Sequence, residues 1–340
     1  MAVSARSSRW PTRDAWRRFA RNKAARIGLI VLLLLAAASV VTLPLSIRWY
    51  DLQQLDTAVR HGPASSPVVD QQRYLEALER SSAGKVAKAI APVGHGAASW
   101  LGHDDLGRSL LYRLLPGFLV SLSIGLAAAM VAVIIGATWG ALAALAGGRI
   151  DALMMRIVDV LYSLPYILMV ILLKIALTRP LAELLGGRTK YADIVVLFLA
   201  IGGVSWLTMA RVVRGQVLSL REQPFIEAAR AAGAGWWYIL RRHLAPNLVG
   251  PATVYATLVI PQAILQESFL SFLGIGVQQP VPSLGRLAAD GVQAVNTFVG
   301  FWWLLVLPCG VLVVALFSLN FIGDGLRDAL DPKSQAATLV

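Results

Sequence analysis

Cysteine, histidine and charged residues are all scarce in this chain of 340 residues. The single cysteine, Cys309, excludes an internal disulfide framework and any metal site built from several cysteines. Only four histidines are present. His95 and His103 lack the spacing of a recognised metal site, so we expect no metal and interpret both as surface-loop residues. Charged residues make up 15% of the chain and hydrophobic residues 57%, against about 25% and about 45–50% in soluble domains. This composition excludes an ordinary soluble enzyme.

The hydrophobic residues gather in long blocks with few or no charges. A helix needs about 20 mostly apolar residues to cross a membrane, and blocks of this kind predict six spans. They are residues 27–47, 114–148, 157–173, 194–210, 247–266 and 291–323, with 301–322 the densest part of the last. The predicted fold class is an all-α membrane protein with six transmembrane helices. A cleaved signal peptide is not expected, because the 26 residues before the first block are too long for an n-region.

Positive charge is distributed unevenly between the loops. Residues 1–26 carry eight Lys and Arg against one acid. With this end in the cytoplasm, the cytoplasmic segments hold 18 basic and 7 acidic residues, and the opposite side holds 12 and 9. Cytoplasmic loops of membrane proteins carry the excess of Lys and Arg, so we expect both termini to be cytoplasmic. The net charge of +12 is thus an orientation signal and does not indicate nucleic acid.

The spans divide the chain into five segments. A basic cytoplasmic segment (1–26) precedes the first transmembrane helix (27–47). The hydrophilic segment 48–112 is expected to form a small extracytoplasmic insert, with helical spacing near its middle at 70–90. The core permease domain is assigned to 113–323, including a cytoplasmic loop at 211–248, and a cytoplasmic tail follows at 324–340.

Four ionisable residues lie in or near the predicted spans, where charges are costly. We expect Asp159 to pair locally with Arg156, three residues earlier on one helix face. Lys174, Asp193 and Glu267 lie close enough to span ends to extend toward water or cap a helix. A proton-coupled secondary transporter would show more spans, an internal repeat and midplane acids, so it is the less favoured alternative class.

The segment Gly102–Ser109 (GHDDLGRS) fits the outline of a phosphate-binding loop. Such a loop follows a buried strand and presents a lysine and backbone N–H groups to the phosphate. Here no strand is predicted, and Asp104 and Asp105 would repel the anion. We therefore expect no nucleotide site, no cofactor and no ATPase machinery in this chain.

The most informative segment is the predicted cytoplasmic loop at 225–248. Pro224 is expected to begin a short helix with Glu227 in its early turns, where a carboxylate suits the helix dipole. Alanines give this helix a nearly smooth face, and Gly233 and Gly235 end it. A second helix, 236–244, is predicted to run up to Pro246. The alternative is an amphipathic hairpin lying on membrane lipid, which Trp236 and Trp237 would suit.

The pattern Glu227-Ala228-Ala229, then Gly233, then His243-Leu244-Ala245-Pro246 resembles the signature loop of binding-protein-dependent ABC importer permeases. Three further segments, 99–125, 267–291 and 320–332, resemble the peptide, opine and nickel branch of that family. The chain departs from the branch at a few positions. They are His103, Ser109, Ala245 and Leu284.

The resemblance implies a type I ABC importer permease fold in the bacterial inner membrane and a subunit without catalytic residues. Its implied partners are a second permease subunit, two cytoplasmic ATP-binding subunits and an extracytoplasmic solute-binding protein. It also implies that one short loop couples ATPase motion to alternating access. The residues assigned to this role are Glu227, Ala228, Ala229, Gly233 and Pro246. Dipeptides or oligopeptides are the expected substrates, nickel and opine-like solutes remain open, and the substrate-binding residues stay unassigned within the second to fifth spans.

Overall fold

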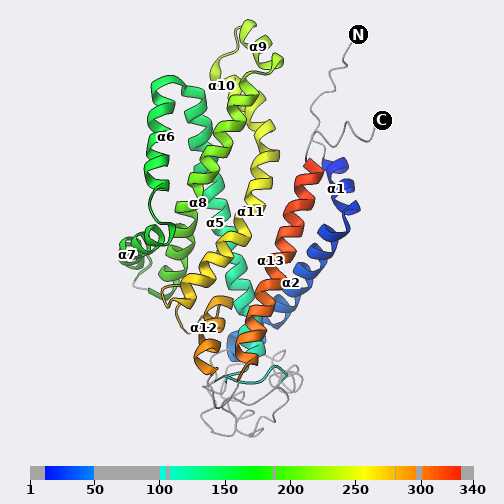
Figure 1. Ribbon diagram of the computed structural model, residues 1–340, viewed down its shortest axis with the longest axis vertical. Helices are drawn as coiled ribbons and strands as arrows, with labels where there is room; N and C mark the ends of the chain where they lie inside the picture. Colours follow the sequence, from blue (N-terminus) through cyan, green and yellow to red (C-terminus); the bar gives the residue numbers. More distant parts are fainter. Residues whose placement is uncertain are drawn as a thin grey trace.

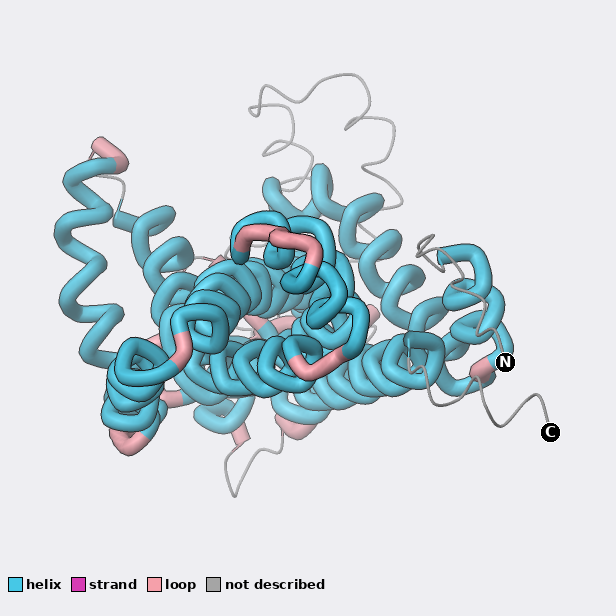
Figure 2. The backbone as a smooth tube through the Cα atoms, turned by 90° about the horizontal axis from the view of Figure 1, so that it is seen from above, coloured by secondary structure: helices cyan, strands magenta, loops and turns pink. Residues whose placement is uncertain are grey.

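The computed structural model describes residues 12–49, 100–104, 108–186, 189–279, 281–295 and 301–330. These residues form helices joined by short loops (Figure 2), and the strand-like pairing among them is an isolated bridge between His103 and Ser109. In chain order the helices are α1 (Thr12–Arg21), α2 (Lys23–Trp49), α5 (Leu110–Ala146), α6 (Gly148–Tyr162), α7 (Tyr166–Leu184), α8 (Thr189–Arg221), α9 (Pro224–Ala231), α10 (Trp236–Ile239), the π-helical turn η1 (Leu240–Leu244), α11 (Ala245–Phe272), α12 (Leu284–Ala294) and α13 (Trp303–Leu330).

Five helical stretches of the described chain are long and apolar enough to cross a membrane. They are Lys23–Leu43, Leu110–Ala146, Ala192–Arg221, Trp236–Phe272 and Trp303–Leu330. A sixth span results if α6 and α7, which are bent by 95° at their junction, are counted as one broken span. The all-helical, multi-span fold class is therefore confirmed, with five or six candidate spans.

The predicted third span, 157–173, is not the continuous helix that its hydropathy suggested. The helix stops at Tyr162 and restarts at Tyr166, and Pro165 in the break has an extended ψ of 123°. Proline lacks the N–H that would continue the hydrogen-bond ladder, and it disfavours helical geometry in the residue before it, Leu164. The apolar composition of the block was read correctly, but the effect of its proline was underestimated.

The last predicted span also begins in the wrong place. Residues 291–294 belong to α12, a separate short helix whose Ser283 cap accepts a hydrogen bond from the Arg286 N–H. The spanning helix α13 begins at Trp303, so its course matches the densest part of the block. The predicted helix at 70–90 lies outside the described residues.

Helices α5 and α8 pack most closely at the centre of the bundle, and small residues explain why. A Cβ on Gly140 of α5 would lie 2.3 Å from the Ala210 carbonyl oxygen of α8, and one on Gly136 would lie 2.7 Å from the Trp206 carbonyl. Conversely, a Cβ on Gly202 of α8 would lie 2.8 Å from the Ala128 carbonyl of α5. Small residues at membrane helix interfaces allow backbones to approach in this way.

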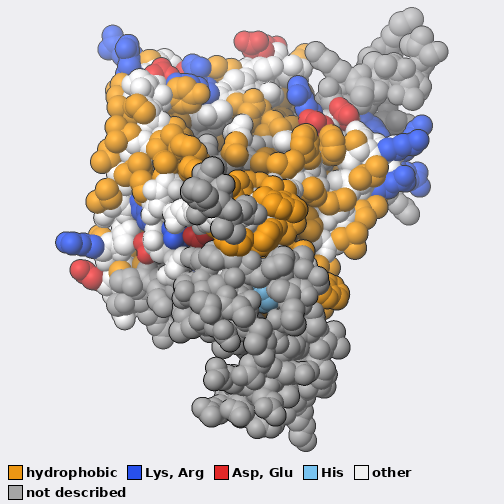
Figure 3. Space-filling view, turned by 60° about the horizontal axis from the view of Figure 1, so that its bottom comes forward, with side chains coloured by type: hydrophobic (Ala, Val, Ile, Leu, Met, Phe, Trp, Pro, Cys, Tyr) orange, Lys and Arg blue, Asp and Glu red, His pale blue; other side chains and the backbone are white. Residues whose placement is uncertain are grey.

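Helices α2 and α13 lie side by side along one flank of the bundle (Figure 1), with Gly28 packed against the Ser318 backbone. Helix α1 folds back against the end of α13, where Phe19 and Ala329 are buried together. Hydrophobic side chains cover much of the described surface, and Lys and Arg gather toward its edges (Figure 3). A wide apolar surface with charges at its margins is the arrangement that a bilayer requires.

Candidate functional site

The loop between α8 and α11 projects from one end of the bundle as a hairpin of two short helices, α9 and α10 (Figure 1). Pro224 occupies the first turn of α9, where a missing N–H costs no hydrogen bond, and Glu227 lies in the same turn. Glu227 and Ala228 are exposed, while Ala229 is half-buried. The predicted short helix is therefore present, and its exposed side carries Phe225 and Arg230 as well as these small residues.

Gly233 ends α9 in a specific geometry. Its φ is +81°, its N–H donates to the Arg230 carbonyl, and the Ala234 N–H donates to the Ala229 carbonyl at 3.0 Å. This pair of bonds is the Schellman motif, which needs a left-handed residue and so favours glycine. Gly235 has an ordinary φ of −65°, so only Gly233 of the two is required by the turn.

The second limb of the hairpin differs from the prediction of a helix that stops at Pro246. Helix α10 passes through the π-helical turn at 240–244 directly into α11, and the Ala245 N–H bonds to the Leu240 carbonyl five residues back. Pro246, in the first turn of α11, has no N–H for the Arg242 carbonyl. A wider turn accommodates that loss without breaking the helix.

The base of the hairpin is fixed by residues that the motif does not contain. Ile226, on the opposite side of α9 from Glu227, is fully buried. It belongs to a cluster with Ile239 and Leu244 of the second limb and with Val213 and Val217 of α8. The sequence does contain a signal for this anchor: Ile226 is a large aliphatic residue next to Glu227 in a helix that is otherwise rich in alanine. The hairpin is therefore anchored to α8 and projects its Glu227 side outward.

Two ion pairs connect α6 to α8 below this hairpin. Arg214 binds Asp151 through two hydrogen bonds of 2.6 Å, and Arg211 binds Asp159 at 2.8 Å. Arg211 also lies 4.0 Å from the centre of the Tyr162 ring. The predicted local pair between Asp159 and Arg156 is therefore wrong, because the partner comes from a helix more than fifty residues away. These contacts hold the first half of the broken span to α8.

The structure also corrects the interpretation of Lys174 and Glu267. The Lys174 ammonium is buried and donates to the carbonyls of Ile275 and Gly276, which follow α11. Glu267 is completely buried; it accepts hydrogen bonds from Ser121 at 2.8 Å and from Ser271 at 2.7 Å. Neither side chain extends toward water. Lys174 connects α7 to the loop after α11, and Glu267 connects α11 to α5. Asp193 is half-buried near the start of α8.

His103 is buried rather than exposed on a surface loop, and it lies beside a group of paired charges. Asp104 accepts hydrogen bonds from the Arg108 side chain at 2.8 Å and from Arg113 at 2.5 Å. Arg113 also reaches Asp290 of α12 at 3.2 Å. Burial lowers the pKa of His103 below its usual value, and the neighbouring Asp104 opposes this only in part. Asp104 is thus paired with Arg108 and Arg113, and Arg113 ties this segment to α12.

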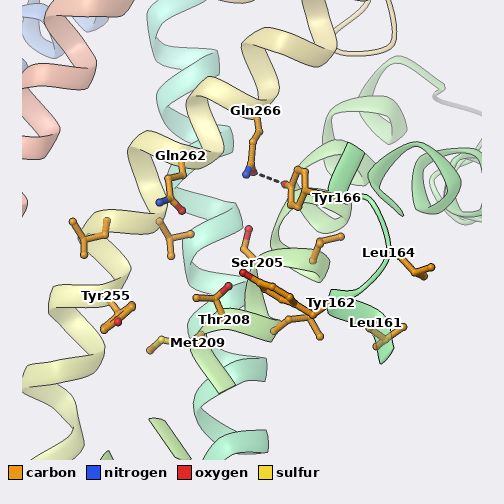
Figure 4. A pocket seen from close by; sticks show the side chains of 14 residues that line it. Leu161, Tyr162, Leu164, Tyr166, Ser205, Thr208, Met209, Tyr255, Gln262 and Gln266 are labelled. Carbon is orange, nitrogen blue, oxygen red and sulfur yellow. Dashed lines mark hydrogen bonds between the residues drawn. The ribbon is translucent and has the colours of Figure 1, made fainter. Parts of the chain in front are cut away.

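A cavity of about 470 Å³ lies between α8, α11 and the junction of α6 and α7 (Figure 4). Tyr166 donates a hydrogen bond to Gln266 across it. Ser205 and Thr208 of α8 and Gln262 of α11 also line it. Sequence reasoning left the substrate-binding residues unassigned and did not single out these polar side chains.

Comparison with known proteins places this geometry in a family. Residues 132–335 match the family model described as the binding-protein-dependent transport system inner membrane component. Residues 8–63 match the N-terminal TM domain of oligopeptide transport permease C. The chain therefore belongs to the family of binding-protein-dependent inner membrane transport components; it is an ABC transporter permease subunit of the inner membrane. The predicted family is confirmed.

Particular relatives are similar over nearly the whole chain. The oligopeptide transport system permease protein OppC of Escherichia coli K12 is 42% identical over 95% of this chain and 91% of its own length. The dipeptide transport system permease protein DppC of Bacillus subtilis is 37% identical over 95% of this chain and 86% of its own. In fold, the chain is similar to a chain of the MetNI methionine ABC transporter, with a TM-score of 0.50 and 22% identity over 65% of this chain and 98% of that one.

Proposed function

We propose that this chain is a translocation-pathway subunit of an ATP-driven importer for dipeptides or oligopeptides. The similarity to OppC and DppC along the chain supports peptides as the substrate. Nickel and opine-like solutes, the alternatives within the branch, receive no comparable support from these relatives. ATP is hydrolysed by two separate cytoplasmic subunits, a second permease subunit completes the pathway, and an extracytoplasmic binding protein delivers the peptide.

The projecting hairpin is the single observation that carries the proposed coupling role. Helix α9 presents Glu227 and Ala228 to its surroundings, and Ala229 packs partly against the hairpin. Gly233 sets the turn, and Pro246 lies in the first turn of α11, directly after the π-helical turn. A smooth helix fixed at its base transmits rigid-body motion from an ATPase groove, whereas a hairpin resting on lipid would only follow the membrane surface.

We propose that the hairpin end of the bundle is cytoplasmic. Helices α9 and α10 lie at the same end of the bundle as α1 and the last turns of α13, and α12 lies at the opposite end (Figure 1). The Lys and Arg excess assigns the hairpin end to the cytoplasm. In a Cys309→Ala background, Ser66→Cys should react with an impermeant thiol reagent added outside, and Ser219→Cys should not. The reverse labelling would refute this orientation.

The function itself is tested with the complete transporter in proteoliposomes. The wild-type complex should take up a short peptide with ATP, and this chain purified alone should show no ATPase activity above background. Glu227→Lys should lower uptake about tenfold or more, because it reverses a charge at a subunit contact. Glu222→Lys, in the exposed turn before α9, is the matched control and should retain uptake. Equal uptake by the wild type, Glu227→Lys and Glu222→Lys would contradict the coupling role.

A further inference from the structure

The cavity between α8, α11 and the α6–α7 junction lies at mid-depth in the predicted spans. Ser205 is at the middle of α8, and the lining residues of α11 extend from Tyr255 to Gln266. Eleven helical residues span about 16 Å, roughly half of a 30 Å hydrocarbon core. The cavity volume of about 470 Å³ falls within the range of roughly 300–1,000 Å³ found for small-molecule sites.

The break in the third span creates this cavity. The chain turns by 95° between Tyr162 and Tyr166, so α7 does not continue the direction of α6, and it packs against α8 near Gly203. The stretch of α8 from Val204 to Met209 is left without a helix along that side and becomes one wall. Tyr162 and Tyr166, at the two edges of the break, become part of the rim, and α11 closes the opposite side (Figure 4).

Two polar side chains in the cavity would be costly if this surface faced lipid. Thr208 and Gln262 are both exposed, and neither has a side-chain hydrogen-bond partner within the described residues. The exposed Thr138 and the half-buried Thr253, by contrast, donate at 2.7 Å to carbonyls of their own helices four residues back. An unpaired amide or hydroxyl in hydrocarbon costs several kcal/mol. This surface therefore faces a polar environment in the assembled transporter.

The spacing on α11 shows that the polar groups form one surface. Tyr255, Gln262 and Gln266 are seven and four residues apart, so they lie along a single helix face. Gln262 and Gln266 point toward Ser205, Thr208 and Tyr166 across the cavity (Figure 4). Each glutamine amide offers both a donor and an acceptor pair, which matches the N–H and C=O groups of a peptide main chain.

The lining also distinguishes between solute classes. Its polar groups are hydroxyls and amides, all neutral, and the remaining lining side chains are apolar. A divalent transition metal is held by imidazole, thiolate or carboxylate groups. Tyrosine rings and aliphatic side chains instead suit variable apolar substituents, and neutral amides suit a repeating backbone. The chemistry of the cavity therefore fits a peptide in transit.

We propose that this cavity is the part of the translocation path contributed by this chain, and that Gln262, Gln266 and Tyr166 bind main-chain amides of the passing peptide. The proposal rests on the function proposed above and adds a site and a recognition chemistry to it. Recognition through the main chain accounts for a path that accepts peptides of different side chains.

The first test measures uptake of an alanine tripeptide by the complete transporter in proteoliposomes. Gln262→Leu and Gln266→Leu should each lower the kcat/KM of uptake about 2- to 10-fold, the factor expected for one lost hydrogen bond. Gln216→Leu is the matched control, because Gln216 is an exposed glutamine of α8 that does not line the cavity. Basal ATPase activity and chain level in the membrane should be unchanged in the control.

A second measurement does not depend on tolerance of the glutamine substitutions. In a Cys309→Ala background, Thr208→Cys should react with a small thiol reagent during turnover. Alanine tripeptide at ten times its Kd should slow that reaction about tenfold, because the rate falls with the fraction of empty sites. Free Ni²⁺ should give no protection. If the partner permease instead covers this surface, the introduced cysteine will not react, and the proposal is overturned.

The outcomes separate the site from the function. A wild-type complex that imports no peptide overturns the proposed function and this site together. A wild-type complex that imports peptide, with glutamine variants equal to Gln216→Leu and no protection of the introduced cysteine, overturns the site alone. Protection by Ni²⁺ and not by the tripeptide overturns the assigned recognition chemistry.

Discussion

The turn after α9 allows the coupling role to be tested by a substitution that adds a single methyl group. In Gly233→Ala, the new Cβ would meet no atom within 4 Å, so no steric clash arises. The cost comes from the backbone, because Gly233 has a φ of +81°. A left-handed conformation costs an L-residue roughly 1–2 kcal/mol, which shifts a two-state equilibrium by a factor of about 5 to 30.

That shift acts on the orientation of α9. If residue 233 leaves the left-handed region, the Ala234 N–H can no longer donate to the Ala229 carbonyl, and the direction of α9 relative to α10 changes. Gly235→Ala is a closely matched control. Gly235 is also exposed and also has open space around its Cβ position, but its φ is −65°. Gly233→Asn should recover most of the loss, because asparagine tolerates the left-handed region.

The assay is the number of ATP molecules hydrolysed per peptide imported by the reconstituted transporter. We expect this ratio to rise several-fold, within the factor of about 5 to 30 given above, for Gly233→Ala. It should stay at the wild-type value for Gly235→Ala and fall between the two for Gly233→Asn. An equal ratio for the two alanine variants would refute the reasoning, because it would show that the geometry of this turn does not control coupling.

Two further predictions concern stability and the outer loop. Gly140→Ala places a Cβ 2.3 Å from the Ala210 carbonyl oxygen. The α5–α8 contact should therefore lose about 1–3 kcal/mol of stability, and the Tm in detergent should fall. Gly310→Ala is the control: it has open space around its Cβ position and should not lower the Tm. Because burial lowers the pKa of His103, the unfolded chain binds the extra proton first; stability should therefore fall as pH drops below about 6.5. His103→Thr should reduce the difference in Tm between pH 7.5 and pH 5.5, and an unchanged difference would contradict the assignment to His103.

The hydrophobic blocks predicted most of the helices because burial in lipid demands long apolar runs, whatever the helices pack against. Their ends were harder to predict. Helix α8 continues to Arg221, eleven residues past the uncharged block, since Arg211 and Arg214 find carboxylates on α6. A charge ends an apolar block in a hydropathy reading, but a paired charge need not end a helix.

The ionisable residues show the limit of reading neighbours along the chain. Asp159 has a basic residue three positions away, yet it pairs with Arg211 of another helix. Glu267 looked like a residue near a span end, yet it is enclosed by serines of α5 and α11. The partner of each carboxylate depends on which helices pack side by side, and the spacing of residues along the chain does not show that packing.

The geometry of α9 and its terminating turn was predictable because it is local. Pro224, Glu227 and Gly233 act within a few residues of one another, and capping rules describe each of them. The cavity was not predictable, because its walls come from three segments brought together by a break at Pro165. A signal was present in Gln262 and Gln266, two amide side chains four residues apart in a largely apolar helix. Polar residues on one face of a spanning helix mark a surface that avoids lipid.

The hairpin and the cavity are joined by two helices without interruption. Helix α8 runs from the cavity wall at Thr208 to the base of α9, thirteen residues on or about 20 Å. On the other side, Trp236–Phe272 is one continuous helical stretch, because the π-helical turn absorbs the effect of Pro246. Under the proposed coupling role, a displacement of α9 would reach both walls of the cavity through these two helices. Arg211 and Arg214 tie α6 to α8, so we expect closure of the cavity to require movement of α11 relative to α8.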